Sequence, residues 1–221
     1  MLDTRDLLYA LDLMGTASFA FSGALRSLQR RPDIVGMIIL ATATAIGGGI
    51  IRDSVLLNRP AATLRDMNYL LVVLGSVLVT ALFPGGLLRR ERVFLYFDGV
   101  GLGIFSAIGA AIAWKEGMNP VSVVFAACLT GAGGGVIRDV LLGQMPVVLY
   151  REVYVSAVAA GAVAMMIVRA LGGGEQAGFL VAMSTTMILR LLALYYNWSL
   201  PRIMGPPQPP SEPPSPAPPP A

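Results

Sequence analysis

The chain has 221 residues, of which 55% are hydrophobic and 13% are charged, and its mean hydropathy is +0.69. Soluble globular chains carry about 25% charged residues, so this composition favours a membrane protein. A single cysteine, Cys128, excludes an intrachain disulfide, and the lack of histidine argues against a zinc site or histidine-based catalysis. We therefore predict no catalytic residues, no metal site and no cofactor.

The net charge of +3 comes largely from arginines in short connections between apolar segments. Nucleic-acid binding requires a basic face with stacking aromatic residues, and the sequence has no such cluster. We interpret the basicity as the excess of arginine that membrane proteins keep on their cytoplasmic side. The expected partner is therefore membrane lipid and not nucleic acid.

Seven apolar segments follow one another, and each approaches the length of a membrane helix, roughly 17–25 residues. They cover residues 7–27, 34–57, 67–83, 93–114, 120–143, 151–171 and 176–198, separated by short connections rich in Pro and Gly. Asp3, Asp6 and Asp12 do not fit a cleaved signal peptide, so the first segment is interpreted as a retained helix. The expected fold class is an all-α membrane protein with seven transmembrane helices.

The connections are too short to form a soluble domain, so residues 1–205 are expected to form one transmembrane domain. From residue 206 onwards the sequence is dominated by proline. Residues 206–221 are therefore expected to be a disordered, polyproline-like tail. A solvated tail is the favoured interpretation, and docking to a groove on a partner is the alternative.

The basic residues also predict an orientation. With the N-terminus outside, the inner side holds Arg26, Arg30, Arg31, Arg89, Arg90, Arg92, Arg151 and Arg202, and the outer side holds Arg5, Arg59, Arg65, Lys115 and Arg169. The positive-inside rule then favours an outer N-terminus and an inner C-terminus.

The two halves of the chain are related by an ungapped shift of 86 residues. This shift pairs Gly47–Asp53, which reads Gly-Gly-Gly-x-x-Arg-Asp, with Gly133–Asp139, and it pairs Asp12 with Asp98. Consecutive glycines and charged residues do not agree in one frame by chance. We infer a duplication with repeat one at about residues 5–86 and repeat two at about 91–172.

Each repeat contains three apolar segments, and the seventh, at about 176–198, lies outside them. Because three is an odd number, the second repeat must insert upside down relative to the first. Equivalent segments then face each other near the middle of the membrane. The expected architecture is two inverted three-helix repeats plus a seventh helix.

Three consecutive glycines cost a helix about 1 kcal/mol each relative to alanine, so they need a reason. One reason is close packing of helices. The other is a kink or break that frees carbonyl oxygens, which are suitable ligands for alkali cations. We favour the second interpretation. The ion-pathway residues are then Gly47, Gly48, Gly49, Gly133, Gly134 and Gly135.

Four nearby residues are further candidates for this pathway. Thr44 and Thr130, one turn before the triplets, could add hydroxyl oxygens, although hydrogen bonding back to their own helix is the more usual role. Phe19 and Phe105, which the shift also pairs, could plug or line the path. Simple packing is the safer interpretation for both rings.

Several ionisable residues fall within the apolar segments, where they should face protein or water and not lipid. They are Asp12, Arg52, Asp53, Asp98, Arg138, Asp139 and Arg190. Their depths predict an outer pair, Asp12 with Arg52, and an equivalent inner pair, Asp98 with Arg138, while Arg190 could join the inner carboxylates. Such pairs either lock the bundle or act as charged latches or gates at the mouths of a pathway.

The segments Ala45–Asp53 and Ala132–Asp139, with the ending Arg190–Pro201, resemble the bacterial branch of the trimeric intracellular cation channel (TRIC) family, over about residues 5–202. The resemblance implies a homotrimer in a bacterial inner (plasma) membrane, with a pore for K⁺ or Na⁺ inside each subunit. Helices two and five, kinked at the glycine triplets, would shape that pore. Animal members also carry a Lys-Glu-Val stretch and bind phosphoinositide, and no matching stretch is present here.

Two functions remain open. The first is a passive monovalent cation channel. The second is a secondary transporter for glycine or another small amino acid, because inverted repeats with broken helices are common in that class and this bacterial branch is sometimes labelled in that way. An enzyme is a poor interpretation without a Ser/His or metal constellation, and a purely structural role leaves the glycines and charges unexplained.

Overall fold

The computed structural model describes residues 4–83, 92–150 and 153–198. Three parts of the sequence-based interpretation lie outside the described residues. They are the proline-rich tail at 206–221, the connection between the repeats at 84–91, and the loop arginines Arg89, Arg90, Arg151 and Arg202.

All regular structure in the described residues is helical, and no strand occurs among them. In chain order the elements are α1 (Thr4–Ser27), η1 (Leu28–Arg30), α2 (Ile34–Ile51), η2 (Arg52–Leu56), η3 (Ala62–Leu64), α3 (Met67–Leu82), α5 (Val93–Lys115), α6 (Pro120–Leu141), α7 (Val147–Tyr150), α8 (Val155–Ala170) and α9 (Glu175–Tyr196). The elements η1 and η3 are 3₁₀ turns, and η2 is a π-helix. The all-α prediction is confirmed, and the long helices match the predicted apolar segments to within a few residues.

Helix length separates the predicted spans into two groups. Five helical stretches are long and apolar enough to cross a membrane: Asp6–Arg30, Ile34–Leu56, Val93–Lys115, Pro120–Leu141 and Glu175–Tyr196. The helices α3 and α8 have 16 residues each, about 24 Å of helix against a hydrocarbon core of about 30 Å. Membrane crossing by α3 and α8, and with it the count of seven spans, stays a prediction.

Polar residues set the starts of α2 and α6 at equivalent places in the two halves. The Asp33 carboxylate accepts a hydrogen bond from the Gly36 amide at 2.7 Å. Asn119, 86 positions after Asp33, accepts one from the Ser122 amide at 3.0 Å, and Pro120 takes the first helical position. Both caps satisfy amides that the start of a helix leaves unpaired.

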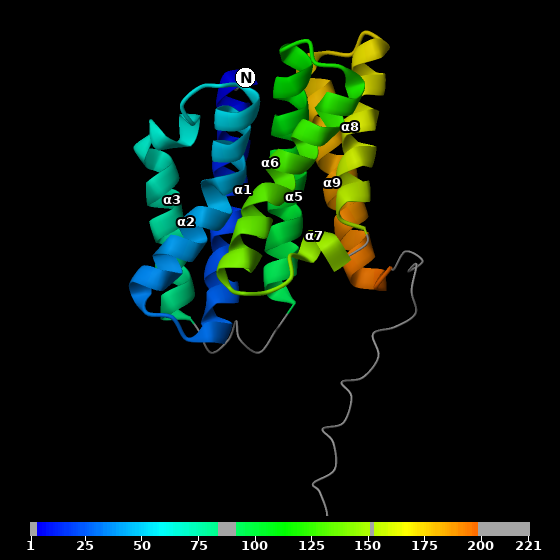
Figure 1. Ribbon diagram of the computed structural model, residues 1–221. Helices are drawn as coiled ribbons and strands as arrows, with labels where there is room; N and C mark the ends of the chain where they lie inside the picture. Colours follow the sequence, from blue (N-terminus) through cyan, green and yellow to red (C-terminus); the bar gives the residue numbers. More distant parts are fainter. Residues whose placement is uncertain (1–3, 84–91, 151–152, 199–221) are drawn as a thin grey trace, which may run out of the picture.

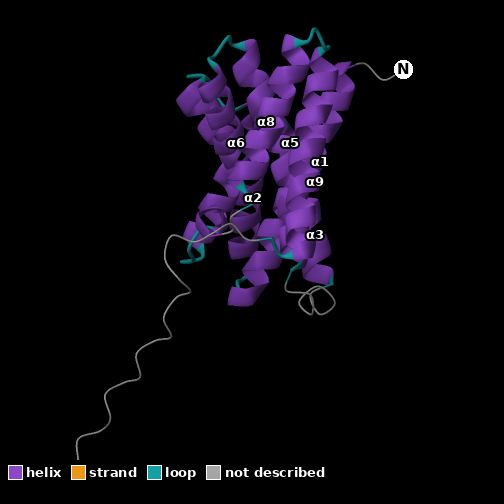
Figure 2. Ribbon diagram, turned by 90° about the vertical axis from the view of Figure 1, so that its right-hand side faces the viewer, coloured by secondary structure: helices purple, strands orange, loops and turns teal. Residues whose placement is uncertain are grey.

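The helices form one bundle in which the first half packs against the second (Figure 1). Helix α1 contacts α2, α3 and α5, and helix α6 contacts α2, α5 and α8. Helix α9 packs on α5 and α8, away from α3, and the long helices run roughly up and down when the molecule is turned by 90° (Figure 2). The centre of the bundle is therefore made by α1, α2, α5 and α6.

Helices α2 and α6 cross at two glycines that leave no room for a side chain. A Cβ added to Gly48 would collide with the carbonyl oxygen of Thr130, and one added to Gly134 would collide with the carbonyl oxygen of Thr44. Small residues allow helix backbones in membranes to approach this closely. Because Gly48 and Gly134 are 86 residues apart, as are Thr44 and Thr130, the contact is reciprocal.

A second reciprocal contact joins α1 and α5. The rings of Phe19 and Phe105 stack with their centroids 5.3 Å apart and their planes within 9° of parallel. Each ring also covers a glycine of the other helix, since Phe19 lies against Gly101 and Phe105 lies against Gly15. Both phenylalanines are buried, so in this conformation they fill the centre of the bundle.

Alanine at the α2–α6 crossing should destabilise the protein. In Gly48→Ala or Gly134→Ala the new methyl group must push the two helices apart, and overpacking of this kind costs about 1–3 kcal/mol. Gly49→Ala is the matched control, because the atoms of Arg52 and Thr63 nearest to an added Cβ are 3.9 Å away. Thermal unfolding in detergent should give a lower Tm for the first two variants only. An unchanged Tm in both would show that the crossing is not tightly packed.

Candidate functional site

The glycine triplets lie inside continuous helices and not at breaks in them. Gly47–Gly49 belong to α2, Gly133–Gly135 belong to α6, and all six glycines are buried. The Arg52 amide donates to the carbonyls of Gly48 and Gly49, so these oxygens are engaged within the helix. The carbonyls of Gly48 and Gly49 are therefore not free in this conformation, where the glycines serve the close approach of α2 and α6. A kink at the triplets, and their contact with ions, stay predictions.

The two halves differ just after the triplets. In the first half the backbone continues as the π-helix η2 (Arg52–Leu56), whereas the equivalent residues of the second half stay α-helical as far as Leu141. π-Helical turns are frequent at functional sites. The Arg-Asp pair of the first half therefore lies in a π-helix, and that of the second half lies in an α-helix.

Thr44 and Thr130 are almost fully buried, with 0% and 1% of their surface exposed. Each hydroxyl donates to the carbonyl four residues earlier in its own helix, at 2.6 Å for Thr44 and 2.7 Å for Thr130. Thr44 also packs against Gly23 of α1, and Thr130 packs against Gly109 of α5. The structure thus shows the more usual role of hydrogen bonding within the helix.

A buried ion-pair network lies near the end of α6. The Arg138 Nη1 atom is 2.6 Å from Asp98 Oδ1 and donates to the Ser22 hydroxyl at 2.7 Å, while Nε is 2.9 Å from Asp139 Oδ1. The ion-paired side chains are at most 1% exposed. Asp139 also accepts a hydrogen bond from the Val147 amide at 2.8 Å. The contact predicted between Asp98 and Arg138 is present, and the network joins α1, α5, α6 and α7.

Aromatic rings and two further arginines surround this network. The ring of Phe94 lies 5.6 Å from the guanidinium carbon of Arg138 and 4.5 Å from that of Arg26. Arg190 of α9 is 2% exposed, donates to a backbone carbonyl just before α8 at 3.1 Å, and lies 4.7 Å from the centre of the Tyr154 ring. Cation–π contacts of this kind are stabilising in desolvated surroundings.

The equivalent charges of the first half are arranged differently. The Arg52 Nε atom is 2.8 Å from Oδ1 of the adjacent Asp53, and the Arg59 Nη2 atom is 3.7 Å from the same oxygen. Asp12 accepts a hydrogen bond from the Tyr69 hydroxyl at 2.6 Å. Within the described ranges no ion pair joins Asp12 to Arg52. The direct contact predicted between Asp12 and Arg52 is therefore absent in this conformation, because each of these two groups is engaged by another partner.

A polar network surrounds the start of α3 at the N-terminal end of the bundle. The Tyr9 hydroxyl donates to the Asp66 carboxylate, and the Asn68 side-chain amide donates to the Tyr9 oxygen at 2.8 Å. The rings of Tyr9 and Tyr69 meet edge to face at 6.3 Å. The hydrogen bonds from Tyr9 and from the Asn68 backbone lower the pKa of Asp66, so this carboxylate stays ionised at neutral pH.

Sequence comparison missed the tyrosines and the serine of these networks. Tyr69 and Tyr154 each stand at the start of the third long helix of their half, but they are 85 residues apart, so a shift of 86 does not pair them. A comparison of the two halves that allows the shift to vary by one residue at helix starts would have paired these tyrosines. Ser22 is paired with Ile108 by the shift, and nothing in the sequence marks it as a partner of Arg138.

Removal of one carboxylate should affect the two halves unequally. Asp98→Asn breaks a fully buried ion pair with Arg138, which costs about 3 kcal/mol or more. The equivalent change, Asp12→Asn, breaks no described ion pair and keeps an acceptor for Tyr69, so it should cost about 1 kcal/mol or less. Unfolding of both purified variants by heat or denaturant measures the difference. Equal losses would contradict the asymmetry between the halves.

A family model described as "Glycine transporter" matches the chain twice, over residues 9–84 and 95–170. The two matched segments begin 86 residues apart and end 86 residues apart, which is the shift that relates the two halves. Together they cover more than half of the chain.

Similar curated proteins are bacterial membrane proteins. A "UPF0126 membrane protein" of Deinococcus radiodurans is 45% identical over 157 residues, which are 70% of this chain and 73% of the relative. A protein of the same description from Vibrio cholerae is 37% identical over 205 residues, 90% of this chain and 84% of the relative. The inner membrane protein YadS of Escherichia coli is 34% identical over 197 residues, 88% and 95% of the two chains.

Similar solved structures are cation channels. A prokaryotic TRIC channel in 0.5 M KCl has a TM-score of 0.83 and 33% identity, covering 89% of this chain and all of that one. The TRIC orthologue from Rhodobacter sphaeroides has a TM-score of 0.81 and 32% identity, covering 87% and 99%. Ion channels are not enzymes, which agrees with the expectation for this chain. The sequence match over both halves and the shared fold establish that the chain is a membrane protein of the TRIC channel family.

Proposed function

We propose that the protein is a passive channel for monovalent cations, K⁺ or Na⁺, and that it works as a homotrimer with a pore inside each subunit. Membership of the TRIC family supports this proposal, as does 32–33% identity to solved TRIC cation channels over most of the chain. Passive conduction requires no cofactor, and K⁺ or Na⁺ is the permeant ion in this proposal.

The observation that carries the proposal is the α2–α6 crossing, with buried charges toward both ends of the bundle. Asp12 lies in the first half of α1, beside the start of α3. The Arg138 network reaches Ser22, near the other end of α1. In this proposal a cation passes through one subunit between these two groups of charges, by way of the place where Gly48 and Gly134 meet.

The proposed architecture is seven spans arranged as two inverted three-helix repeats followed by α9. The reciprocal contacts at Gly48 and Gly134, and at Phe19 and Phe105, support a two-fold relation between the halves. The two family-model matches at a spacing of 86 residues support the duplication. In this arrangement α3 and α8 are short spans, and the bilayer adapts to them.

The pathway is closed at the crossing in this conformation. The glycine backbones touch the opposing helix there, and Thr44, Thr130 and both phenylalanines are buried. The carbonyl oxygens of Thr44 and Thr130 point at the opposing glycines. Each of these oxygens already accepts the amide four residues later in its helix, but a carbonyl oxygen has a second lone pair. Separation of α2 and α6 would expose that lone pair to the path, so we propose the Thr44 and Thr130 carbonyls as cation contacts beside the glycine triplets. Carbonyl oxygens are good ligands for K⁺ and Na⁺.

In our proposal the buried charged residues line the two mouths of this pathway. The inner mouth holds Asp98, Arg138, Asp139 and Arg190, and Arg138 is the latch, because its guanidinium group must leave Asp98 before the carboxylate can face a cation. The outer mouth holds Asp12, Arg52 and Asp53. Arg52 is already engaged by Asp53, so this mouth has no equivalent latch to release.

The proposed location is the inner membrane of a bacterium, with the N-terminus outside and the C-terminus inside. Homology to bacterial membrane proteins supports the membrane location, and the arginine-rich inner connections support the orientation. In this proposal residues 1–205 form the channel domain, and the proline-rich residues 206–221 lie outside it.

A second candidate function is secondary transport of glycine or another small amino acid. The description of the matching family model, "Glycine transporter", favours it. Repeated halves that meet at a central crossing also suit alternating access, in which one mouth opens while the other closes. The different states of the Arg52 and Arg138 sites are compatible with such a cycle.

Flux through liposomes containing the purified protein distinguishes the two functions. A channel should carry K⁺ down its gradient and give unitary currents in planar bilayers, and added glycine should leave both unchanged. A transporter should instead show saturable glycine counterflow without unitary currents. Protein-free liposomes provide the baseline. Glycine counterflow without K⁺ current would replace the channel by the transporter.

Cysteine accessibility tests whether the path passes the crossing. The single native cysteine is replaced in Cys128→Ser, and Thr44→Cys is added to this background. Ile39→Cys is the matched control, because Ile39 is on the same helix but 58% exposed. A cationic thiol reagent should block most of the K⁺ flux in conducting Thr44→Cys channels and leave the control unchanged. Unchanged flux in both would place the route elsewhere in the subunit.

A further inference from the structure

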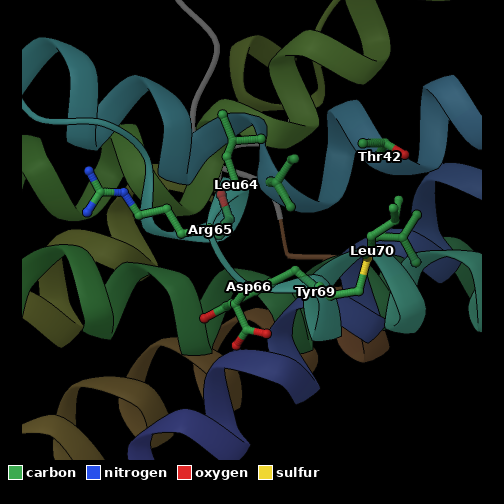
Figure 3. A pocket seen from close by; sticks show the side chains of 10 residues that line it. Thr42, Leu64, Arg65, Asp66, Tyr69 and Leu70 are labelled. Atoms are coloured by element: carbon green, nitrogen blue, oxygen red, sulfur yellow. The ribbon is translucent and has the colours of Figure 1, made fainter.

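A pocket that the conduction pathway does not use lies between α2 and α3, at the N-terminal end of the bundle (Figure 3). Its volume is about 390 Å³, which falls within the range of about 300–1,000 Å³ typical of ligand sites. Apolar side chains of α2, η3 and α3 line most of it, among them Ile46, Leu64, Leu70 and Val73. An alkyl chain fits this lining.

The outer surface around the pocket is strongly apolar. Leu64 is 69% exposed, Met67 is 66% exposed, and on the outer side of α3 Leu71 is 57% exposed. In a membrane protein such a surface faces hydrocarbon, so lipid tails lie directly beside the pocket. The first molecules able to enter it are therefore membrane lipids.

Two opposite charges stand at the rim of the pocket. Arg65 extends away from the hollow in Figure 3, and no described residue forms an ion pair with it. Asp66 points toward α1, where the Tyr9 hydroxyl holds it, and it is ionised. The rim therefore offers an uncommitted cation next to a fixed anion.

Because α3 is short, the charges at its start lie close to the hydrocarbon core, at the level of the lipid headgroups. Its 16 residues span about 24 Å, which leaves about 6 Å of a hydrocarbon core of about 30 Å uncovered. Charged groups at that depth need polar partners, or the bilayer must become thinner around them. A lipid headgroup drawn down to the rim would satisfy both charges.

The pocket wall contains one further polar group without a partner. Thr63 is 8% exposed, and its hydroxyl has no hydrogen-bond partner among the described residues. A purely alkyl occupant would leave this donor unsatisfied. A phospholipid carries ester carbonyls between its headgroup and its chains, at the level where such a donor lies.

We propose that this pocket binds one acyl chain of a phospholipid whose zwitterionic phosphoethanolamine headgroup lies on the rim, with its phosphate at Arg65 and its ammonium group at Asp66. A lipid chain gains little when it moves from the bilayer to an apolar pocket, because both surroundings are equally apolar. Selectivity therefore comes from the headgroup. Anionic phosphatidylglycerol lacks the ammonium group, and the trimethylated ammonium of phosphatidylcholine has no N–H to donate to Asp66. This site does not depend on whether the protein conducts ions.

Native mass spectrometry of the purified protein in mild detergent tests the site. Phosphatidylethanolamine, phosphatidylglycerol and phosphatidylcholine are added separately at equal concentration. We expect one phosphatidylethanolamine per subunit and about tenfold weaker retention of the other two lipids. Arg65→Ala should weaken phosphatidylethanolamine binding by about tenfold, since a charge-assisted hydrogen bond contributes about that factor.

A matched pair of tryptophan variants locates the chain. Leu70→Trp fills the pocket and should abolish the bound lipid, whereas Leu71→Trp changes the adjacent residue, which does not line the pocket, and should retain it. Equal Tm values for the two variants show that both are folded. Retention of lipid in folded Leu70→Trp would overturn the location, and equal binding of all three lipids would overturn the headgroup assignment. The K⁺ flux of the same variants is scored separately, so failure of the lipid site and failure of the channel proposal are distinguishable.

Discussion

The backbone contact between α2 and α6 is the constraint on which the rest of the structure depends. At Gly48 and Gly134 the two helices touch without any side chain between them. The third glycine of each triplet serves a different purpose: the space beside Gly135 is occupied by Asp98 and Arg138, within 3.6 Å of where a Cβ would stand. In each triplet the earlier glycines therefore allow the two helices to approach, and the last glycine leaves space for a charged side chain.

The space beside the last glycine of each triplet holds charged side chains. Burial of an unpaired charge costs free energy, which explains why these side chains are paired. Without water in the bilayer core, a buried guanidinium group needs carboxylates and hydroxyls around it. Arg138 finds them on three helices, in Asp98, Asp139 and Ser22. Arg52 stands on a π-helical turn and has a more local set of partners. The same motif thus has two different arrangements within one chain.

Much of the fold could be predicted from the sequence, because membrane helices are long apolar runs and a duplication leaves a fixed spacing. The helix bounds, the repeat and the Asp98–Arg138 contact came from these two signals. The partner of Asp12 could not be predicted, because Tyr69 lies one residue out of the repeat frame. The local pairing of Arg52 with Asp53 could not be predicted either, because no recognisable sequence pattern encodes the π-helix that carries them. The role of the glycines could not be decided from the sequence, because consecutive glycines permit both a kink and a close contact, and the opposing helix decides between them.

The reciprocity of the α2–α6 contact has a consequence for the origin of the chain. Gly48 meets Thr130 just as Gly134 meets Thr44, so the surface is isologous: the same patch is used on both sides. Two copies of a half-length chain, inserted in opposite directions, would make the identical contact as a symmetric dimer. A single chain that contains both halves is not bound by that symmetry, and Arg52 and Arg138 have different partners in it.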